Sequence, residues 1–295
     1  GQHKALRGLH FCFWPPQPFC PACFRPATDV HMLSMKRAIL LVAFGASSAQ
    51  GQNALKSFDA LVRQRYPGVP VRWAFTSLLL RERLAQARQK SDSVLKALSR
   101  LGFERFTHVA VQPLQTIPGS EHEQVCAAVA EVAARQGLAC RVGTPLLQNP
   151  EDVQETARAL VRHLPAERMP DEDVVCMGHG ARHAAVGRYA DLAAAVRALD
   201  PRVHVGTMNG AVLLEDILPR LTSPAVWLLP LLSVVGRHAL RDMAGTQPQS
   251  WRSRIEERGR RCRPVLLGTA EYDGFAQLWL RHLEAVAQPL FASAE

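Results

Sequence analysis

The sequence has no apolar run long enough to cross a membrane as a helix. Its longest apolar stretch, Ala225 to Gly236, is interrupted by Pro230, and it is shorter than the roughly 18 residues that a spanning helix needs. The chain also lacks a cationic start followed by an apolar segment, which is the pattern of an export signal. We therefore expect neither a membrane protein nor a membrane partner.

Three patterns of common enzyme sites are also missing. The chain has no Gly-x-x-x-x-Gly-Lys-Ser phosphate loop and no Gly-x-Gly-x-x-Gly fingerprint, which argues against ATP and dinucleotide cofactors. It has no Gly-x-Ser-x-Gly elbow, which argues against a serine hydrolase. Imidazole, carboxylate and amide groups remain, and imidazole suits divalent Co, Ni, Fe, Cu and Zn.

The seven cysteines show no pairing pattern. An odd count without a disulfide framework favours reduced thiols in a cytoplasmic protein. Cys20 and Cys23 have the spacing of half a zinc site, which Cys12, His10 or His31 would complete, but the tight spacing is not repeated elsewhere.

The first 34 residues are rich in proline and lack hydrophobic periodicity. We expect residues 1–34 to be a mobile N-terminal extension. Met35, followed by two cations and an apolar strand, resembles a natural beginning, so the sequence leaves open whether the extension is native.

From Met35 onward, apolar stretches typical of buried strands alternate with stretches of helical spacing. The predicted strands are 38–45, 69–75, 107–114, 173–180, 202–207, 225–232 and 264–269. Predicted helices between and after them include 91–102, 120–137 and 274–290. This alternation predicts an α/β fold with parallel, doubly wound sheets flanked by helices.

An internal match indicates two similar halves. PLQTIPG (113–119) and PLLSVVG (230–236) share Pro-Leu and a glycine six positions after the proline, and each follows an apolar strand. We predict an N-terminal half over 35–163 and a C-terminal half over 174–290, with the active-site cleft between them.

Polar side chains follow the predicted strand ends, where ligands of open α/β sheets bind. We therefore expect five of them to converge on the cleft: Glu121, His122, His179, Asn209 and His238. His179 lies between two glycines, which keep bulk away from its imidazole.

The chain is basic, with 35 Lys and Arg against 26 Asp and Glu and a formal charge of +9. Basic surfaces suit polyanionic ligands. Because the basic residues are scattered and no zinc-finger spacing or aromatic-interleaved basic ribbon occurs, we do not expect nucleic acid as a partner. A polycarboxylate ligand stays open.

Six stretches together carry a resemblance to a known family. They are ILLVAFGAS, PVRWAFTSLLLRERL, VAVQPLQTIPGSEHE, MGHGARHAAVGRYADL, VHVGTMNGAVLLEDIL and LLPLLSVVGRHALRDMAG. In this order they resemble the anaerobic cobalt chelatases of the CbiK type, in the class II chelatase superfamily, over essentially residues 36–290. MGHG combined with GxHAxxDMAG is the specific part of the match.

The resemblance implies a lyase-class enzyme that inserts Co²⁺ into sirohydrochlorin or precorrin-2, without ATP, in anaerobic cobalamin biosynthesis. Sirohydrochlorin is a reduced tetrapyrrole with eight carboxylates. A divalent metal, Co²⁺ or Fe²⁺, is then a substrate, and no organic cofactor is needed. Insertion of iron for sirohaem and a non-catalytic tetrapyrrole or metal carrier on the same fold remain alternatives. The sequence does not decide which metal is preferred or whether the protein forms a homo-oligomer.

The resemblance also implies roles for particular residues. His179 is a metal ligand and proton acceptor, His238 is the second metal ligand, and Glu121 lines the same cleft as a catalytic group. Asn209 stands where the family usually has glutamate, and a neutral amide binds a dication more weakly than a carboxylate. Gln115 also departs from the family's usual histidine.

Elementary chemistry agrees with these roles. Metal insertion requires two pyrrole N–H protons to leave, and a neutral imidazole can both hold the ion and accept a proton. Arg81, Arg182 and Arg237 could bind the peripheral carboxylates of the macrocycle, although Arg237 replaces the aspartate of the family's usual GDHA. A solvated surface role for each arginine stays open.

Overall fold

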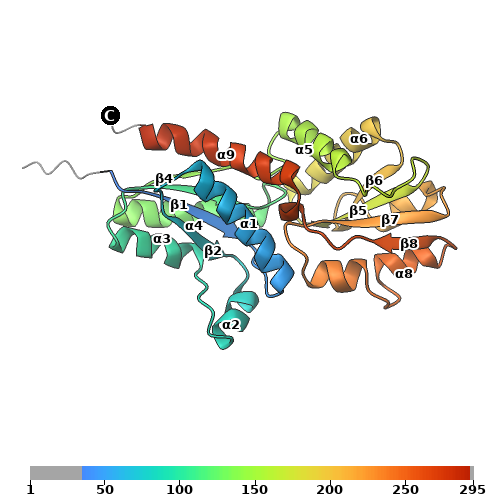
Figure 1. Cartoon of the computed structure of the whole chain (residues 1–295), viewed down its shortest axis with the longest axis horizontal. Coiled ribbons are helices and arrows are strands. Elements are labelled where there is room, and N and C mark those ends of the chain that lie inside the picture. The colour runs from blue at the N-terminus through green and yellow to red at the C-terminus, as the bar shows by residue number, and fades with distance from the viewer. Residues whose placement is uncertain (1–34, 293–295) are drawn as a thin grey trace, which may run out of the picture. The chain divides into compact units, whose positions relative to one another are not determined.

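Two parallel sheets organise the part of the chain that this computed structural model describes, residues 35–292 (Figure 1). The first sheet has the strand order β2-β1-β3-β4 and the second has the order β6-β5-β7-β8, so the second repeats the connectivity of the first. All neighbouring strands in both sheets pair in parallel. The predicted α/β fold of two similar halves is confirmed. The predicted extension over 1–34 and its half zinc site lie outside the described residues.

The strands are β1 Arg37–Ala43, β2 Val71–Phe75, β3 His108–Pro113, β4 Ala139–Val142, β5 Asp173–Gly180, β6 Val203–Asn209, β7 Ala225–Leu231 and β8 Arg261–Pro264. The α-helices are α1 Ala49–Arg65, α2 Leu78–Gln86, α3 Val94–Phe103, α4 Ser120–Gln136, α5 Pro150–Arg162, α6 Gly187–Leu199, α7 Leu214–Ile217, α8 Trp251–Glu256 and α9 Asp273–Ala292. Short 3₁₀ turns occupy Ala184–Val186, Leu218–Arg220 and Thr269–Glu271, and a π-helical turn occupies His238–Met243. No helix among residues 35–292 is long and apolar enough to cross a membrane.

The central strands are buried because helices cover both faces of each sheet. Every residue of β7 and all but the first residue of β1 are buried, which explains why both strands read as continuous apolar runs rather than alternating ones. The apolar cluster that joins the halves includes Leu41, Trp279 and Leu229.

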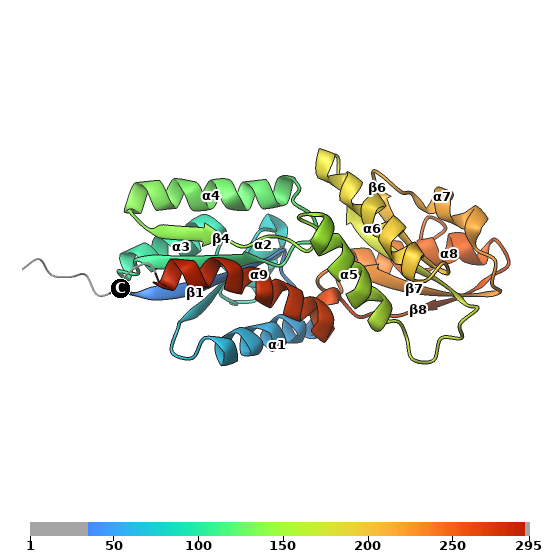
Figure 2. The same cartoon turned by 90° about the horizontal axis from the view of Figure 1, so that it is seen from above.

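Two helices exchange partners between the halves. α5 follows the first sheet in the chain, yet it packs against α6, and α9 returns from the second sheet to pack against β3 and β4 (Figure 2). The indole N–H of Trp279 on α9 donates to the Gln115 carbonyl oxygen after β3, at 3.3 Å. The residues from Met35 onward form one compact unit, in which this exchange ties the two sheets together.

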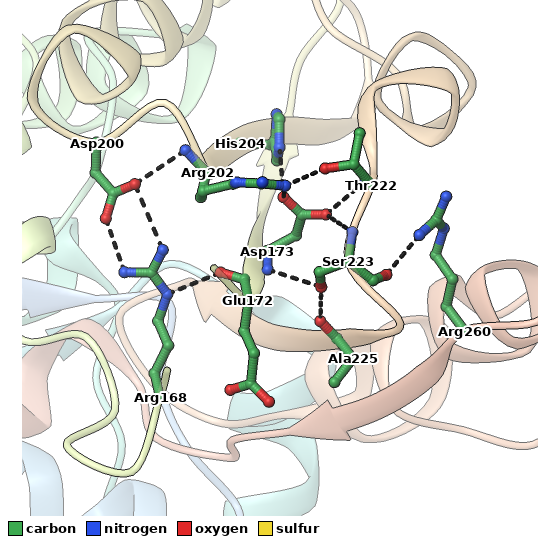
Figure 3. Close-up of polar contacts among 10 residues, drawn as sticks. All are labelled: Arg168, Glu172, Asp173, Asp200, Arg202, His204, Thr222, Ser223, Ala225 and Arg260. Carbon is green, nitrogen blue, oxygen red and sulfur yellow. Dashed lines mark hydrogen bonds and ion pairs between the residues drawn. The ribbon is translucent and has the colours of Figure 1, made fainter. Parts of the chain in front are cut away.

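A polar network fixes the amino end of β5 (Figure 3). The fully buried Asp173 carboxylate accepts hydrogen bonds from the backbone N–H groups of Thr222, at 2.7 Å, and Ser223, at 2.8 Å. The Arg202 guanidinium lies 3.4 Å from the same carboxylate. A buried charge satisfied in this way is tolerated, and it holds the strand whose other end carries His179.

Candidate active site

Loops that follow strands of both sheets touch one another. The Ser48 hydroxyl, after β1, donates to the Val235 carbonyl oxygen, after β7, at 3.4 Å. His183, after β5, has its Nε2 atom 3.1 Å from a carboxylate oxygen of Glu123, on the helix that follows β3. The carboxyl ends of β1 and β3 in the first sheet therefore meet the segments that follow β5 and β7 in the second.

His179 and His238 lie side by side at this edge. Their ring centroids are 4.9 Å apart, and the rings are inclined by 73°. His179 is the penultimate residue of β5, and His238 opens the π-helical turn after β7. The two side chains meet because β5 and β7 are neighbours in the sheet.

The Nδ1 atom of each ring is already engaged. His179 Nδ1 lies 3.0 Å from the Gly180 carbonyl oxygen, and His238 Nδ1 lies 2.6 Å from an Asp242 carboxylate oxygen. Because both partners are acceptors, Nδ1 carries the proton in each neutral imidazole. Each Nε2 then keeps its lone pair, which is the arrangement of metal-binding histidines.

The two glycines beside His179 are each required for a different steric reason. A Cβ on Gly178 would lie 2.5 Å from the ring of Tyr189. Gly180 has a φ of +75°, and a Cβ there would lie 1.8 Å from the Asn209 carbonyl oxygen. Both positions therefore exclude a side chain, and His179 is displayed between them with its own side chain exposed.

Asn209 ends β6 and pairs in register with Gly180, so it lies at the same sheet edge as His179. Its side chain is exposed. Among residues 35–292, no group of three or more His, Cys, Asp or Glu side chains is arranged to hold a metal ion. The histidine pair thus has no third ligand of these types, in keeping with an amide at 209.

Glu121 lies in the first turn of α4, where the helix dipole favours a carboxylate. Its carboxylate accepts a hydrogen bond from the Thr76 hydroxyl. Burial raises the pKa of Tyr189 to about 12, and the charge of Glu121 adds to this rise.

His122, next to Glu121, contacts side chains of the first half, from the loop after β3 and from α4. Its Nδ1 lies 3.2 Å from Gln115 Oε1, and its Nε2 lies 3.5 Å from the Cys126 sulfur. Burial lowers the pKa of His122. The structure thus brings His179 and His238 together and gives His122 other contacts.

The three arginines predicted to bind substrate occupy different elements. Arg182 and Arg237 are exposed, lie in the loops that carry the histidines, and form no side-chain hydrogen bond or ion pair with the described residues. Arg81 is half-buried on α2, and its Nε is buried with no hydrogen-bond partner among residues 35–292.

Sequence reasoning missed two contacts. Asp242 contacts His238, and the available signal was its position four residues later within the DMAG motif. His183 Nε2 lies 3.1 Å from the Glu123 carboxylate of α4, so it links the halves.

Comparison with known proteins agrees with this architecture. Residues 37–288 match the sequence model of the cobalt chelatase (CbiK) family. The chain belongs to this chelatase family. It is 55% identical over 264 residues to the sirohydrochlorin cobaltochelatase CbiKC of Nitratidesulfovibrio vulgaris, with 88% of this chain and 94% of that protein covered. The predicted family membership is confirmed.

Two further proteins are similar to this chain at lower identity. The sirohydrochlorin cobaltochelatase of Salmonella typhimurium is 33% identical over 258 residues, covering 84% of this chain and 96% of that protein. The solved structure of the sirohydrochlorin chelatase SirB from Bacillus subtilis subspecies spizizenii, in complex with cobalt, has a TM-score of 0.60 at 16% identity. It covers 88% of this chain and 98% of that one, and it shows the shared fold.

Proposed function

We propose that this chelatase inserts Co²⁺ into sirohydrochlorin without ATP, in anaerobic cobalamin biosynthesis. The observation that carries the proposal is the His179–His238 pair, with ring centroids 4.9 Å apart and both Nδ1 atoms engaged. Two relatives that are largely covered by this chain are named for the same reaction.

In the proposed mechanism, Co²⁺ replaces two pyrrole N–H protons, so the charge on the macrocycle is unchanged. His238 and His179 hold the incoming ion through Nε2. As the metal passes to the ring nitrogens, His179 is released and accepts one proton. Glu121, on the first-sheet side, is the second acceptor, and both protons then leave to solvent. The metal–nitrogen bonds drive the exchange, so no nucleotide is needed.

We further propose that Arg81, Arg182 and Arg237 bind the peripheral carboxylates of the substrate. A guanidinium can form two parallel hydrogen bonds with a carboxylate. Arg182 and Arg237 are free of protein partners among the described residues, and they adjoin the histidine loops. They are therefore available to hold the macrocycle over the metal.

The divalent metal is a substrate in this proposal, and no organic cofactor takes part. A cytoplasmic location is supported by the free thiols of Cys126, Cys140, Cys176 and Cys262. Burial raises the pKa of Cys176 to about 12, so this thiol is unreactive near neutral pH.

Single-turnover metallation tests the function directly. Sirohydrochlorin absorbance is followed with Co²⁺ and Fe²⁺ in parallel, with and without protein. We expect the protein to accelerate Co²⁺ insertion far above the rate in buffer. Faster turnover of Fe²⁺ would assign the chain to sirohaem synthesis instead, and binding without acceleration would make it a carrier.

A further inference from the structure

Asp242 is the only carboxylate that hydrogen-bonds to either histidine of the pair within residues 35–292. The contact is 2.6 Å long, which is short for a bond between nitrogen and oxygen and typical of a charge-assisted one. The His238 side chain is 40% exposed and that of Asp242 is 36% exposed, so the pair lies at the rim of the site.

We infer that Asp242 is a positioning residue that supplies negative charge to the metal site through the ring of His238. The inference rests on the proposed function of this site. Asn209, at the same edge, is an uncharged amide, and both histidine ligands are neutral when they bind metal. A carboxylate that accepts from Nδ1 fixes the ring orientation, directs Nε2 outward and makes that nitrogen a stronger donor to a cation.

The π-helical turn places His238 and Asp242 in this geometry. Ala239 and Met243, which follow His238 and Asp242 in the chain, are fully buried and anchor the turn in the core. The Ala244 N–H donates to the Ala239 carbonyl oxygen at 3.0 Å, which is the spacing of a π-helix. Turns of this kind are rare and are frequent at functional sites.

The two histidines differ in the group that accepts a hydrogen bond from their Nδ1 atoms. His179 donates to a backbone carbonyl of Gly180, which is neutral. His238 donates to a carboxylate. The negative charge therefore reaches the ion through His238 and not through His179.

The exposed pair Arg252–Glu256 on α8 is the natural comparison. It also joins residues four apart, at 3.1 Å, with side chains 37% and 39% exposed. Exposed pairs of this kind contribute little to stability. Removal of either carboxylate is thus expected to leave the fold intact, so that an effect on metal binding can be measured separately.

The experiment titrates Co²⁺ alone into the whole protein by calorimetry, without tetrapyrrole, and records the visible spectrum of bound Co²⁺. Asp242→Asn keeps an acceptor oxygen for His238 but loses the charge, whereas Asp242→Glu keeps the charge. We expect Asp242→Asn to bind Co²⁺ 10- to 100-fold more weakly, the size typical for such outer partners, with an altered spectrum. Asp242→Glu should retain most of the affinity, and Glu256→Gln should match the wild type.

Affinity of Asp242→Asn within twofold of the wild type would overturn the inference, as would an equal loss in Glu256→Gln. Thermal unfolding of each variant establishes that it is folded, and Asp242→Ser, which also removes the charge, replaces Asp242→Asn if that variant does not fold. Sirohydrochlorin metallation by the wild type is measured beside these titrations. If the wild type metallates sirohydrochlorin and Asp242→Asn binds Co²⁺ as tightly as the wild type, only the role of Asp242 is rejected. If the wild type does not metallate sirohydrochlorin but Asp242→Asn binds Co²⁺ more weakly, only the proposed reaction is rejected.

Discussion

Gly180 and Asn209 stand opposite each other in the β5–β6 ladder, so close that a Cβ on Gly180 would fall 1.8 Å from the Asn209 carbonyl oxygen. This backbone approach brings the end of β6 against the loop that carries His179. A glycine is required there both for its φ of +75° and for the missing side chain.

Gly180→Ala should therefore damage the site and the fold together. The added methyl group strains the backbone and pushes β6 away, so we expect a loss of about 1–3 kcal/mol in the free energy of unfolding and weaker Co²⁺ binding. Urea unfolding and Co²⁺ calorimetry measure the two effects. Gly187→Ala is the matched control, because a Cβ on Gly187 meets nothing within 4 Å. Equal stability of the two variants would contradict this account of the close approach.

Asn209→Glu should tighten Co²⁺ binding. A carboxylate at the sheet edge beside His179 adds a charged ligand where the chain has an amide, and a charge-assisted contact contributes roughly one to two kcal/mol. Calorimetric titration of both proteins with Co²⁺ measures the change, and insertion rates show whether firmer retention slows transfer. Unchanged affinity would mean that residue 209 does not face the metal.

The stability of the protein should fall as the pH drops below about 6.5, the ordinary pKa of histidine. Burial lowers the pKa of His204 in β6, while Asp173 opposes this shift. The unfolded chain then binds more protons than the folded one, so stability is full above 6.5 and is lost as the pH falls toward the lowered pKa. Burial lowers the pKa of His122 and His163 as well.

His204→Gln removes one of these groups and should flatten the fall. The free energy of unfolding in urea, measured at pH 7 and at pH 5.5, gives the slope for each protein. Identical slopes for the variant and the wild type would show that His204 does not titrate on unfolding.

The strands that the sequence predicted best are those buried on both faces. The apolar run at 38–45 corresponds to β1, Arg37–Ala43. The last predicted strand, 264–269, is wrong, since β8 is Arg261–Pro264. Arg261 and Arg263 interrupt the apolar pattern of this half-buried edge strand, so the sequence did not indicate it. Of the apolar residues that follow, Val265 packs against the cluster that joins the halves.

The exchange of α5 and α9 could not be predicted, because chain order says nothing about which sheet a connecting helix covers. The rule that ligands bind beyond strand ends did indicate the edge where His179 and His238 meet. The spacing of four residues between His238 and Asp242 was a usable signal for their contact, whereas the π-helical turn that carries both was not visible in any periodicity. The chemical roles of these residues stay predictions.

His238 should act mainly as a metal ligand, and His179 as both a ligand and a proton acceptor. Single-turnover Co²⁺ insertion into sirohydrochlorin at increasing Co²⁺ concentration tests this difference most directly. His238→Ala should insert slowly at low Co²⁺ and recover much of its rate at high Co²⁺, because it lacks mainly a ligand. His179→Ala should stay slow at saturating Co²⁺, because it also lacks a proton acceptor. Two variants that insert Co²⁺ at the wild-type rate, or that respond alike to added metal, would contradict the account.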